Sequence, residues 1–431
     1  MMDQFSTLGR LDMLRRLLRS RLDGAGSLEA LETSPFVQRV AGSSVKGAAR
    51  SVPVDVMVTP GELNDLHGTG FLVKRVFAGR EGIVSLRVRD DYGGVHDFGE
   101  EAHLVPLRGA RRAEVYSAAL AAVRGRPVRA VYSVPYTSED LTLAMAVSDV
   151  SGAPLCLWEM DDQCIAVPNI PRPLMREFLE KCRIRFATHA ELRDAYEEAF
   201  GLAFGILPAV VPTRLVRKDP LPAWEPRAHG ALLGSVWSRR WLDQLAEVLE
   251  RGGERLEWYG NHQAPGLRLA PDDLAAMPIE PHGVVKEPAL AEALTRHPFV
   301  VVPTSELQGE VSEAEALAAL SLPGRILFAV AAAHSPVLVV GSERTPAAAF
   351  VRRHAIGDVV PYDASAFSAA AARLRRPEKQ AELRENARML APSLSDSGIG
   401  DWLEQSIAAG APRDDRFERL FPRAAPTRET S

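Results

Sequence analysis

Short apolar runs alternate with segments of helical periodicity over residues 53–212. The pattern predicts strands at 54–58, 128–133, 155–160, 184–187 and 205–211, further strand-like stretches within 82–106, and helices at 63–76, 112–123, 172–182 and 189–200. Strands separated by helices of about 10–15 residues are typical of a parallel sheet with helices on both faces. We therefore predict a Rossmann-like, doubly wound domain over residues 53–212.

A second alternating series occupies residues 230–390. It predicts strands at 231–234, 256–259, 283–285, 299–302, 337–340 and 359–360, helices at 238–251, 288–296, 313–320, 324–333 and 345–354, and two or three more helices within 364–408. Residues 213–229 contain three prolines and mixed charge, which favours a linker. The predicted fold class is thus α/β with two Rossmann-like doubly wound domains, whose ligands bind at the carboxyl ends of the strands, facing a cleft. Residues 391–431 are left as a C-terminal helix and tail.

Residues 1–52 precede the first domain and have a different pattern. Leucines share one helical stripe in the first 22 residues, with five arginines nearby, and residues 23–52 are rich in Gly, Ala and Ser. We expect an amphipathic helix followed by a connection. Residues 5–21 would contact a membrane surface or a second subunit, or would pack on the chain's own domain.

Composition narrows the function classes. The chain has 431 residues, too many for one hydrophobic core, and its net charge of −5 argues against a nucleic-acid partner. Three scattered cysteines and the lack of a signal peptide predict a cytoplasmic protein, with attachment to the inner face of the membrane as an option. The most apolar run, 326–341, is interrupted and shorter than the roughly 20 residues that a membrane helix needs.

The stretch 299–341 carries the main candidate for ligand binding. A strand ends at Thr304 and Ser305, and a later helix starts at Gly324 and Arg325 after a proline. Free N–H groups at a helix start attract phosphate, glycine permits close approach, and arginine can donate two parallel hydrogen bonds to a diphosphate. The alternative is a capped core helix with Arg325 on the surface.

The sequence LPGRILFAVAAAHSPVLVVG at 322–341 resembles the PSKxxEyxAxGxPVv motif of retaining GT-B glycosyltransferases. The stretches 232–245, 256–261 and 283–294 are similar to other strand–loop–helix units of the same donor domain. This resemblance covers 231–360 and implies a nucleotide-sugar donor bound in the C-terminal half and transfer with retention. We expect no cofactor, with the nucleotide-sugar as substrate.

The resemblance also implies which residues line the donor pocket. They are Ser235, Trp237, Arg239, Tyr259, Asn261, Thr304, Ser305 and Gly324, with Arg325 facing the phosphates. Two positions depart from the motif: a ribose-binding Glu is expected near Phe328 or Ala329, and His334 replaces a glycine. Glu306 or Glu343, at the ends of the flanking strands, would substitute for the missing Glu.

The N-terminal half offers a glycine loop and an acidic strand end. Gly68, Thr69 and Gly70 open a helix after the first strand, with His67 or Asn64 as catalytic partner. NAD is excluded because position 73 is Val where the dinucleotide fingerprint has its third glycine. Asp161 or Asp162, after the strand at 155–160, would orient an acceptor hydroxyl or cap the next helix, and Asp162 is our catalytic candidate. No DxD motif or His/Cys spacing indicates a metal site.

We therefore expect a glycosyltransferase that acts on an unidentified glycan, lipid-linked or protein acceptor. Arg325 and the helix start at 323–325 would stabilise the leaving diphosphate, with His67 and Asp162 on the acceptor side. Two alternatives remain open: a sugar-nucleotide epimerase on the same scaffold, and a non-catalytic binding or scaffold subunit, which the missing Glu favours.

Overall fold

The computed structural model describes residues 52–422 except 66, 92, 124–125, 221–228, 263–266, 268 and 309–311. The predicted N-terminal helix, including residues 5–21, lies outside the described residues. The chain forms two compact units: unit 1 contains residues up to 207 together with 398–418, and unit 2 contains 208–397 with the residues from 419 onward.

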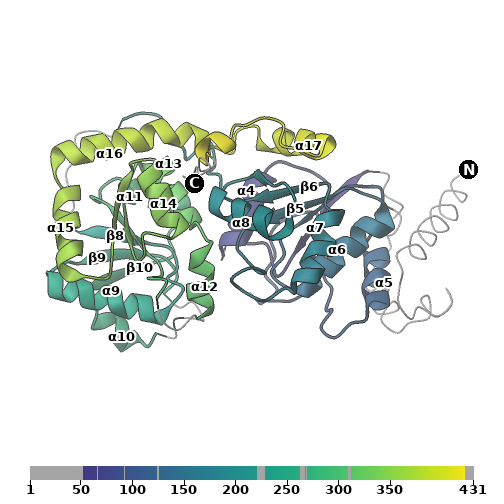
Figure 1. Ribbon diagram of the computed structural model, residues 1–431, viewed down its shortest axis with the longest axis horizontal. Coiled ribbons are helices and arrows are strands. Elements are labelled where there is room, and N and C mark those ends of the chain that lie inside the picture. Colours follow the sequence, from purple (N-terminus) through teal and green to yellow (C-terminus); the bar gives the residue numbers. More distant parts are fainter. Residues whose placement is uncertain are drawn as a thin grey trace, which may run out of the picture. The chain divides into compact units, whose positions relative to one another are not determined.

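Unit 1 is a seven-stranded parallel sheet with strand order β3-β2-β1-β4-β5-β6-β7. Its strands are β1 (Val54–Thr59), β2 (Ile83–Arg87), β3 (Glu101–Leu104), β4 (Val128–Ser133), β5 (Leu155–Glu159), β6 (Ile184–Ala187) and β7 (Gly205–Ile206). The helices are α4 (Gly68–Val76), α5 (Arg112–Val123), α6 (Ser138–Ser151), α7 (Arg172–Lys181), α8 (Ala190–Phe200) and, from the C-terminal end of the chain, α17 (Ile399–Ala409), all labelled in Figure 1.

Unit 2 is a six-stranded parallel sheet with order β10-β9-β8-β11-β12-β13. Its strands are β8 (Gly230–Leu233), β9 (Leu256–Tyr259), β10 (Ile279–Gly283), β11 (Val300–Pro303), β12 (Val337–Val340) and β13 (Gly357–Val360). The helices are α9 (Arg239–Gly252), α10 (Pro271–Ala275), α11 (Glu287–Leu294), α12 (Glu313–Ala319), α13 (Gly324–Ala333), α14 (Pro346–Arg353), α15 (Ala364–Leu374) and α16 (Pro377–Leu390).

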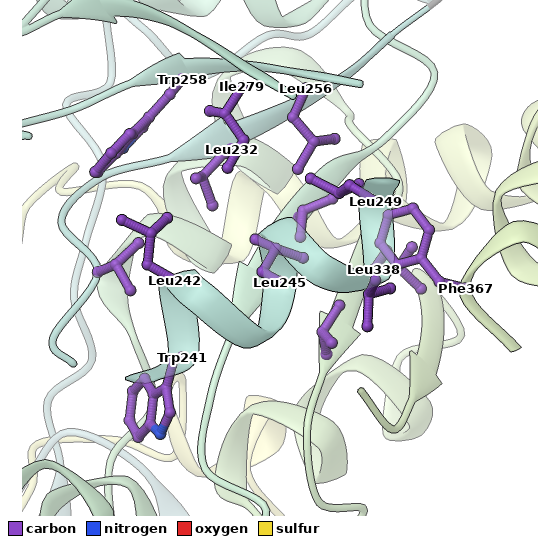
Figure 2. Close-up of a cluster of buried hydrophobic side chains, with 14 of the residues drawn as sticks. Leu232, Trp241, Leu242, Leu245, Leu249, Leu256, Trp258, Ile279, Leu338 and Phe367 are labelled. Carbon is purple, nitrogen blue, oxygen red and sulfur yellow. The ribbon is translucent and has the colours of Figure 1, made fainter. Parts of the chain in front are cut away.

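The core of unit 2 forms between the sheet and helix α9. Leu242, Leu245 and Leu249 of α9 point toward Leu232, Leu256, Trp258 and Ile279 of the strands, whereas Trp241 lies on the other side of α9 and donates to Glu315 (Figure 2). The α9 residues follow the 3–4 residue spacing of one helical face, so burying this face against the sheet fixes the helix. The carboxyl ends of the strands are thereby held in place, and the loops that follow them carry the candidate site.

Two predicted boundaries differ in the structure. Residues 213–220, predicted as linker, pack on unit 2: Thr213 bonds Asp396 and Ser395, and the Arg217 backbone N–H donates to the Ala331 carbonyl. Residues 398–418, predicted as part of a tail, return to unit 1. Sequence periodicity identifies helices but not the unit against which a helix packs, so α17 could not be assigned from its own pattern.

None of the described helices is, by itself, long and apolar enough to cross a membrane, although α12 and α13 together pass that test as a pair bent by 56°.

Candidate functional site

The sheet of unit 2 changes direction between β8 and β11. From β8 the chain proceeds to β9 and β10 on one side, and from β11 it proceeds to β12 and β13 on the other. The segments that follow β8 and β11 therefore diverge over the carboxyl edge of the sheet. In open α/β sheets this switch point is where ligands bind.

Helix α13 begins at this switch point, and Arg325 in its first turn is directed to the loop after β8. Arg325 Nη1 donates to the carbonyl oxygens of Leu233, at 2.9 Å, and of Ser235. No side chain caps the start of the helix, where Pro323 is the N-cap. The positive end of the helix dipole and a guanidinium group are thus brought together at one point.

Arg325 has no acidic partner among the described residues. Desolvation lowers the pKa of its guanidinium to about 10, against only a weak opposing effect of Tyr362. Nε and Nη2 make no hydrogen bond to any described residue, so donor capacity remains. A desolvated cation with unused donors, beside an uncapped helix start, is a site for an anion.

Arg384 shows that burial alone does not produce this arrangement. Its pKa is also lowered to about 10 by burial. All three of its nitrogens nevertheless donate to oxygens, namely Gln380 Oε1 and the carbonyls of Ala333 and His297. Arg384 therefore has its donors used within the fold, whereas Arg325 does not.

Aromatic side chains flank the Arg325 guanidinium. Its central carbon lies 6.0 Å from the ring centroid of Trp237, in the loop after β8. Tyr362, after β13, donates its hydroxyl to the Thr304 carbonyl at 2.9 Å, and desolvation raises its pKa well above the ordinary value. Tyr362 was not predicted from the sequence, although a side chain two residues after the last strand lies where ligands of such sheets bind.

The Pro-Thr-Ser turn after β11 is closed by its own hydrogen bonds. Ser305 Oγ accepts from the Leu307 N–H at 2.7 Å, and the Ser305 carbonyl accepts from the Ser342 N–H at 2.8 Å. Gly341 has a φ of 144°, and a Cβ there would lie 2.7 Å from the Thr304 carbonyl oxygen. Thr304 and Ser305 are buried, so this turn shapes the site mainly through its backbone.

Two of the predicted pocket residues are turned to other partners. Arg239 pairs with Asp243 and Asp273 on the surface. The Tyr259 side chain is buried, donates to Glu257 and stacks on His282. The predictions that the Arg239 and Tyr259 side chains line the donor pocket are therefore corrected. Both side chains bind other partners in unit 2, and the sequence pattern alone does not identify those partners.

The acidic residues proposed to replace the missing Glu are also placed by the structure. Glu343 is exposed and ion-paired with Arg352, which corrects its prediction as a ribose ligand. Glu306 is half-buried after β11 and accepts from Gln244 Nε2 at 3.2 Å. Asn261 is half-buried after β9, beside His262, whose Nδ1 is buried without a hydrogen-bond partner among the described residues. Glu306 and Asn261 thus stay at the carboxyl edge, and His262 joins them.

Helix α13 explains both departures from the motif. Phe328 and Ala329 are buried in the core with the rest of the helix, so neither position faces the site. His334, where the motif has glycine, is the C-cap with φ 47° in the left-handed region that favours glycine. The glycine of the motif thus suits a position that needs a left-handed backbone conformation. His334 adopts this conformation here, and its Nε2 lies 3.1 Å from the Arg217 carbonyl oxygen.

In unit 1 the structure keeps the predicted glycine loop together. His67 is the N-cap of α4, and Gly68, Thr69 and Gly70 form its first turn, again without a side-chain cap. Gly68 is exposed and an added Cβ would meet nothing within 4 Å, whereas a Cβ on Gly70 would lie 2.8 Å from the backbone nitrogen of Asn64. Gly70 is therefore required by packing, and Gly68 is not.

His67 is held by a backbone carbonyl. Its Nε2 lies 2.7 Å from the Glu62 carbonyl oxygen, and burial lowers its pKa. Since a carbonyl only accepts, Nε2 carries the proton, and the lone pair of the neutral ring is on Nδ1. His67 thus has the ionisation state of a general base, and its catalytic role stays a prediction.

Asp162 has a structural role. The side chain is fully buried and accepts four backbone N–H groups, from Cys164, Ile165, Ala166 and Val167, and the Tyr196 hydroxyl. Both carboxylate oxygens are used by the loop that follows β5. This corrects the catalytic prediction for Asp162 and leaves Asp161 as the more exposed acidic residue of the pair. Among the residues the structure describes, no group of three or more His, Cys, Asp or Glu is arranged to hold a metal ion.

Comparisons with known proteins agree with this architecture. No protein-family model and no curated protein sequence matches the chain. Among solved structures, HepE of Anabaena in complex with UDP and glucose is similar at 12% identity and a TM-score of 0.58, covering 83% of this chain and 100% of HepE. WaaG, a glycosyltransferase involved in lipopolysaccharide biosynthesis, is similar at 15% identity and a TM-score of 0.50, covering 82% of this chain and 99% of WaaG. The predicted two-domain, Rossmann-like GT-B architecture is thus confirmed.

Proposed function

We propose that this chain is a glycosyltransferase that binds a nucleotide-sugar donor at the carboxyl edge of unit 2 and transfers the sugar to a hydroxyl acceptor. The observation that carries the proposal is Arg325. Its desolvated guanidinium has no acidic partner in the described part of the chain and stands beside the uncapped start of α13. A diphosphate supplies the negative charge and the oxygen acceptors that this site lacks.

The proposal also draws on the comparison. HepE, which shares the fold, was solved with UDP and glucose bound. We therefore propose a uridine diphosphate sugar as the first donor to test. In transfer the bond between the sugar and the diphosphate breaks, and negative charge grows on the leaving phosphate. Arg325 and the helix start would stabilise that charge, so we propose that no metal is needed.

UDP binding tests the donor site. Thermal unfolding and titration calorimetry of the full chain with UDP, GDP and UDP-glucose should show stabilisation by at least one of them. At a ligand concentration of 100 times Kd, stabilisation of about 2.7 kcal/mol is expected. Arg325→Ala should weaken binding by about 10–100-fold, because a charge-assisted hydrogen bond contributes about 1.5–3 kcal/mol.

Arg239→Ala is the matched control. It removes an arginine from the neighbouring helix start, where the guanidinium is already paired with Asp243 and Asp273. Binding should be unchanged in this variant. If no nucleotide binds, or if Arg239→Ala weakens binding as much as Arg325→Ala does, the proposed donor site is wrong.

A non-catalytic binding subunit is the second candidate, because Phe328 and Ala329 are buried where the motif has a ribose-binding Glu. The two functions share the donor site and differ in turnover. Release of UDP from UDP-glucose favours the transferase, and Arg325-dependent binding without release over a broad acceptor panel favours the binding subunit.

A further inference from the structure

Three polar side chains meet at the switch point of unit 1. The sheet changes direction between β1 and β4, since the chain continues from β1 to β2 and β3 on one side and from β4 to β5 on the other. Thr69 lies in the first turn of α4, which follows β1, Tyr136 lies in the loop after β4, and Asp161 lies in the loop after β5. Residues from three different segments thus meet where such sheets bind ligands.

Their hydroxyl and carboxylate groups form a continuous hydrogen-bonded chain. Thr69 Oγ1 lies 3.0 Å from Tyr136 Oη, and Tyr136 Oη lies 2.7 Å from Asp161 Oδ2. A carboxylate only accepts, so the single proton of Tyr136 points to Asp161. Thr69 must then donate its proton to Tyr136. The remaining lone pairs on Thr69 Oγ1 can accept a hydrogen bond from another group.

The environment of Tyr136 favours proton donation from Thr69 to Tyr136 and from Tyr136 to Asp161. Desolvation raises the pKa of Tyr136 well above its ordinary value, and the charge of Asp161 raises it further, so the phenol keeps its proton. Thr69 is half-buried, and Gly68 beside it is exposed, with open space where a side chain would be. The chain of hydroxyls therefore begins at a side chain that a ligand can reach and ends at a carboxylate.

We propose that Thr69, Tyr136 and Asp161 form a relay that takes the proton from the acceptor hydroxyl during sugar transfer. The proposal rests on the proposed function. As the acceptor oxygen bonds to the anomeric carbon and the bond to the diphosphate breaks, the acceptor proton passes to Thr69 Oγ1. The Thr69 proton then moves to Tyr136 Oη, and the Tyr136 proton moves to Asp161 Oδ2. The diphosphate leaves with the electron pair of the broken bond.

The relay has a stereochemical consequence. A proton acceptor separate from the leaving phosphate is needed when the acceptor attacks from the side opposite that phosphate. Such an attack inverts the configuration at the anomeric carbon. The relay therefore departs from the retention that the sequence resemblance implies.

The experiment uses the full chain with UDP-glucose as donor and either water or methyl β-glucoside as the hydroxyl acceptor. UDP release gives kcat over a range of pH, calorimetry gives the affinity for UDP, and proton NMR gives the anomer formed first. Tyr136→Phe, Asp161→Asn and Thr69→Val each interrupt the relay with little change of shape, whereas Thr69→Ser keeps the hydroxyl.

Tyr116→Phe is the matched control. The Tyr116 hydroxyl also donates to a carboxylate, that of Asp149, but this pair joins α5 to α6 and does not touch the switch point. A loss caused merely by removing a tyrosine–aspartate bond in unit 1 would appear in this variant too.

We expect the three interrupting variants to lower kcat by about 100-fold, the lower end of general-base contributions, with UDP affinity unchanged. Thr69→Ser should restore most of the kcat that Thr69→Val loses, Tyr116→Phe should keep wild-type kcat, and β-glucose should form first from the α-linked donor. The relay is wrong if kcat changes by less than about twofold, if UDP affinity falls in parallel with kcat, or if α-glucose forms first.

Failure of the relay is distinguishable from failure of the donor site. UDP binding that depends on Arg325, without any UDP release, contradicts the relay and leaves the donor site standing. Absence of any nucleotide binding contradicts the proposed function itself.

Discussion

Two glycines in the loop after β1 have different roles, one in packing and the other in the approach of a ligand. Gly68 and Gly70 are two residues apart, yet a Cβ on Gly70 would collide with the Asn64 backbone and one on Gly68 would meet nothing. The same substitution at the two positions therefore separates packing from ligand approach.

Gly70→Ala should destabilise unit 1 by about 1–3 kcal/mol, the usual cost of overpacking, whereas Gly68→Ala should change stability by less than about 0.5 kcal/mol. Hydrogen exchange of the β1 and β4 amides in urea measures the free energy of unfolding of both variants. If Gly68→Ala keeps its stability but loses turnover of UDP-glucose, a ligand approaches the backbone at this glycine. Equal stability loss in both variants would show that our account of the loop is wrong.

Asp140 gives unit 1 a pH-dependent stability. Its carboxylate accepts the backbone N–H groups of Tyr136 and Thr137, and burial nevertheless raises its pKa to about 6. Because the folded pKa is above the unfolded value of 3.8, the contribution of Asp140 is largest at low pH and is lost as the pH rises through about 6.

When the pH is lowered from 7 to 5, the free energy of unfolding of the wild type should thus rise by about 1 kcal/mol relative to that of Asp140→Asn. Asparagine keeps an oxygen for the same N–H groups, so the variant removes the titration and not the cap. Urea unfolding at the two pH values measures the difference. A stability difference that does not vary with pH would contradict this role of Asp140.

The sequence alone could not show which of the residues after the strands face the proposed ligand. Asp161 and Asp162 are adjacent after β5, but Asp162 holds four backbone N–H groups and Asp161 accepts from Tyr136. The N–H partners of Asp162 lie two to five residues further along the chain, whereas the partner of Asp161 comes from the loop after β4, which no local pattern identifies. The position of Arg325 in the first turn of a helix was predictable because the signal is local: a proline and a glycine precede the arginine.

At the scale of elements, the predictions succeeded for α9, in which one face is buried, and for two helices whose predicted bounds agree with the structure. Helices α5 and α13 match their predicted bounds, and α13 is marked by Pro323 and Gly324 at its start. Helix α6 was missed although a capping box at Thr137 and Gly152 mark its ends, and although α13 also has eight buried residues. Strand β10 begins four residues earlier than predicted because Glu280, Pro281 and His282 in it are exposed and polar or proline.

Substitutions in helix α9 test whether its buried face stabilises unit 2. Leu245 is fully buried between α9 and the sheet of unit 2 (Figure 2), whereas Glu247 in the same helix is exposed and pairs with Arg251. Leu245→Ala should destabilise unit 2 by about 2–5 kcal/mol through lost burial and a residual cavity, and Glu247→Ala by less than about 0.5 kcal/mol.

Hydrogen exchange of the β8 and β9 amides reports this difference. Since α9 also fixes the loop that Arg325 bonds, Leu245→Ala should weaken UDP binding only near its unfolding transition. Weaker binding at temperatures where unit 2 is fully folded would mean that α9 controls the site by a route other than stability.

At the scale of the whole molecule, the C-terminal segment stabilises the two units through different residues. In α17 of unit 1, Trp402 packs against Phe186 of β6 and against Phe417. Arg183 donates to the Ala408 carbonyl at the end of the same helix. Phe421 belongs to unit 2 instead, where it packs against Phe350 of α14.

Alanine at each aromatic position should therefore affect one unit only. Trp402 and Phe421 are both buried, so each substitution should cost about 3–5 kcal/mol. Trp402→Ala should lower hydrogen-exchange protection in β5 and β6 and leave α14 unchanged. Phe421→Ala should do the reverse, and UDP binding at low temperature should persist in the Trp402 variant, since the proposed donor site lies in unit 2. If either substitution lowers protection equally in both units, the two units unfold as one, and the C-terminal segment couples them instead of stabilising each by itself.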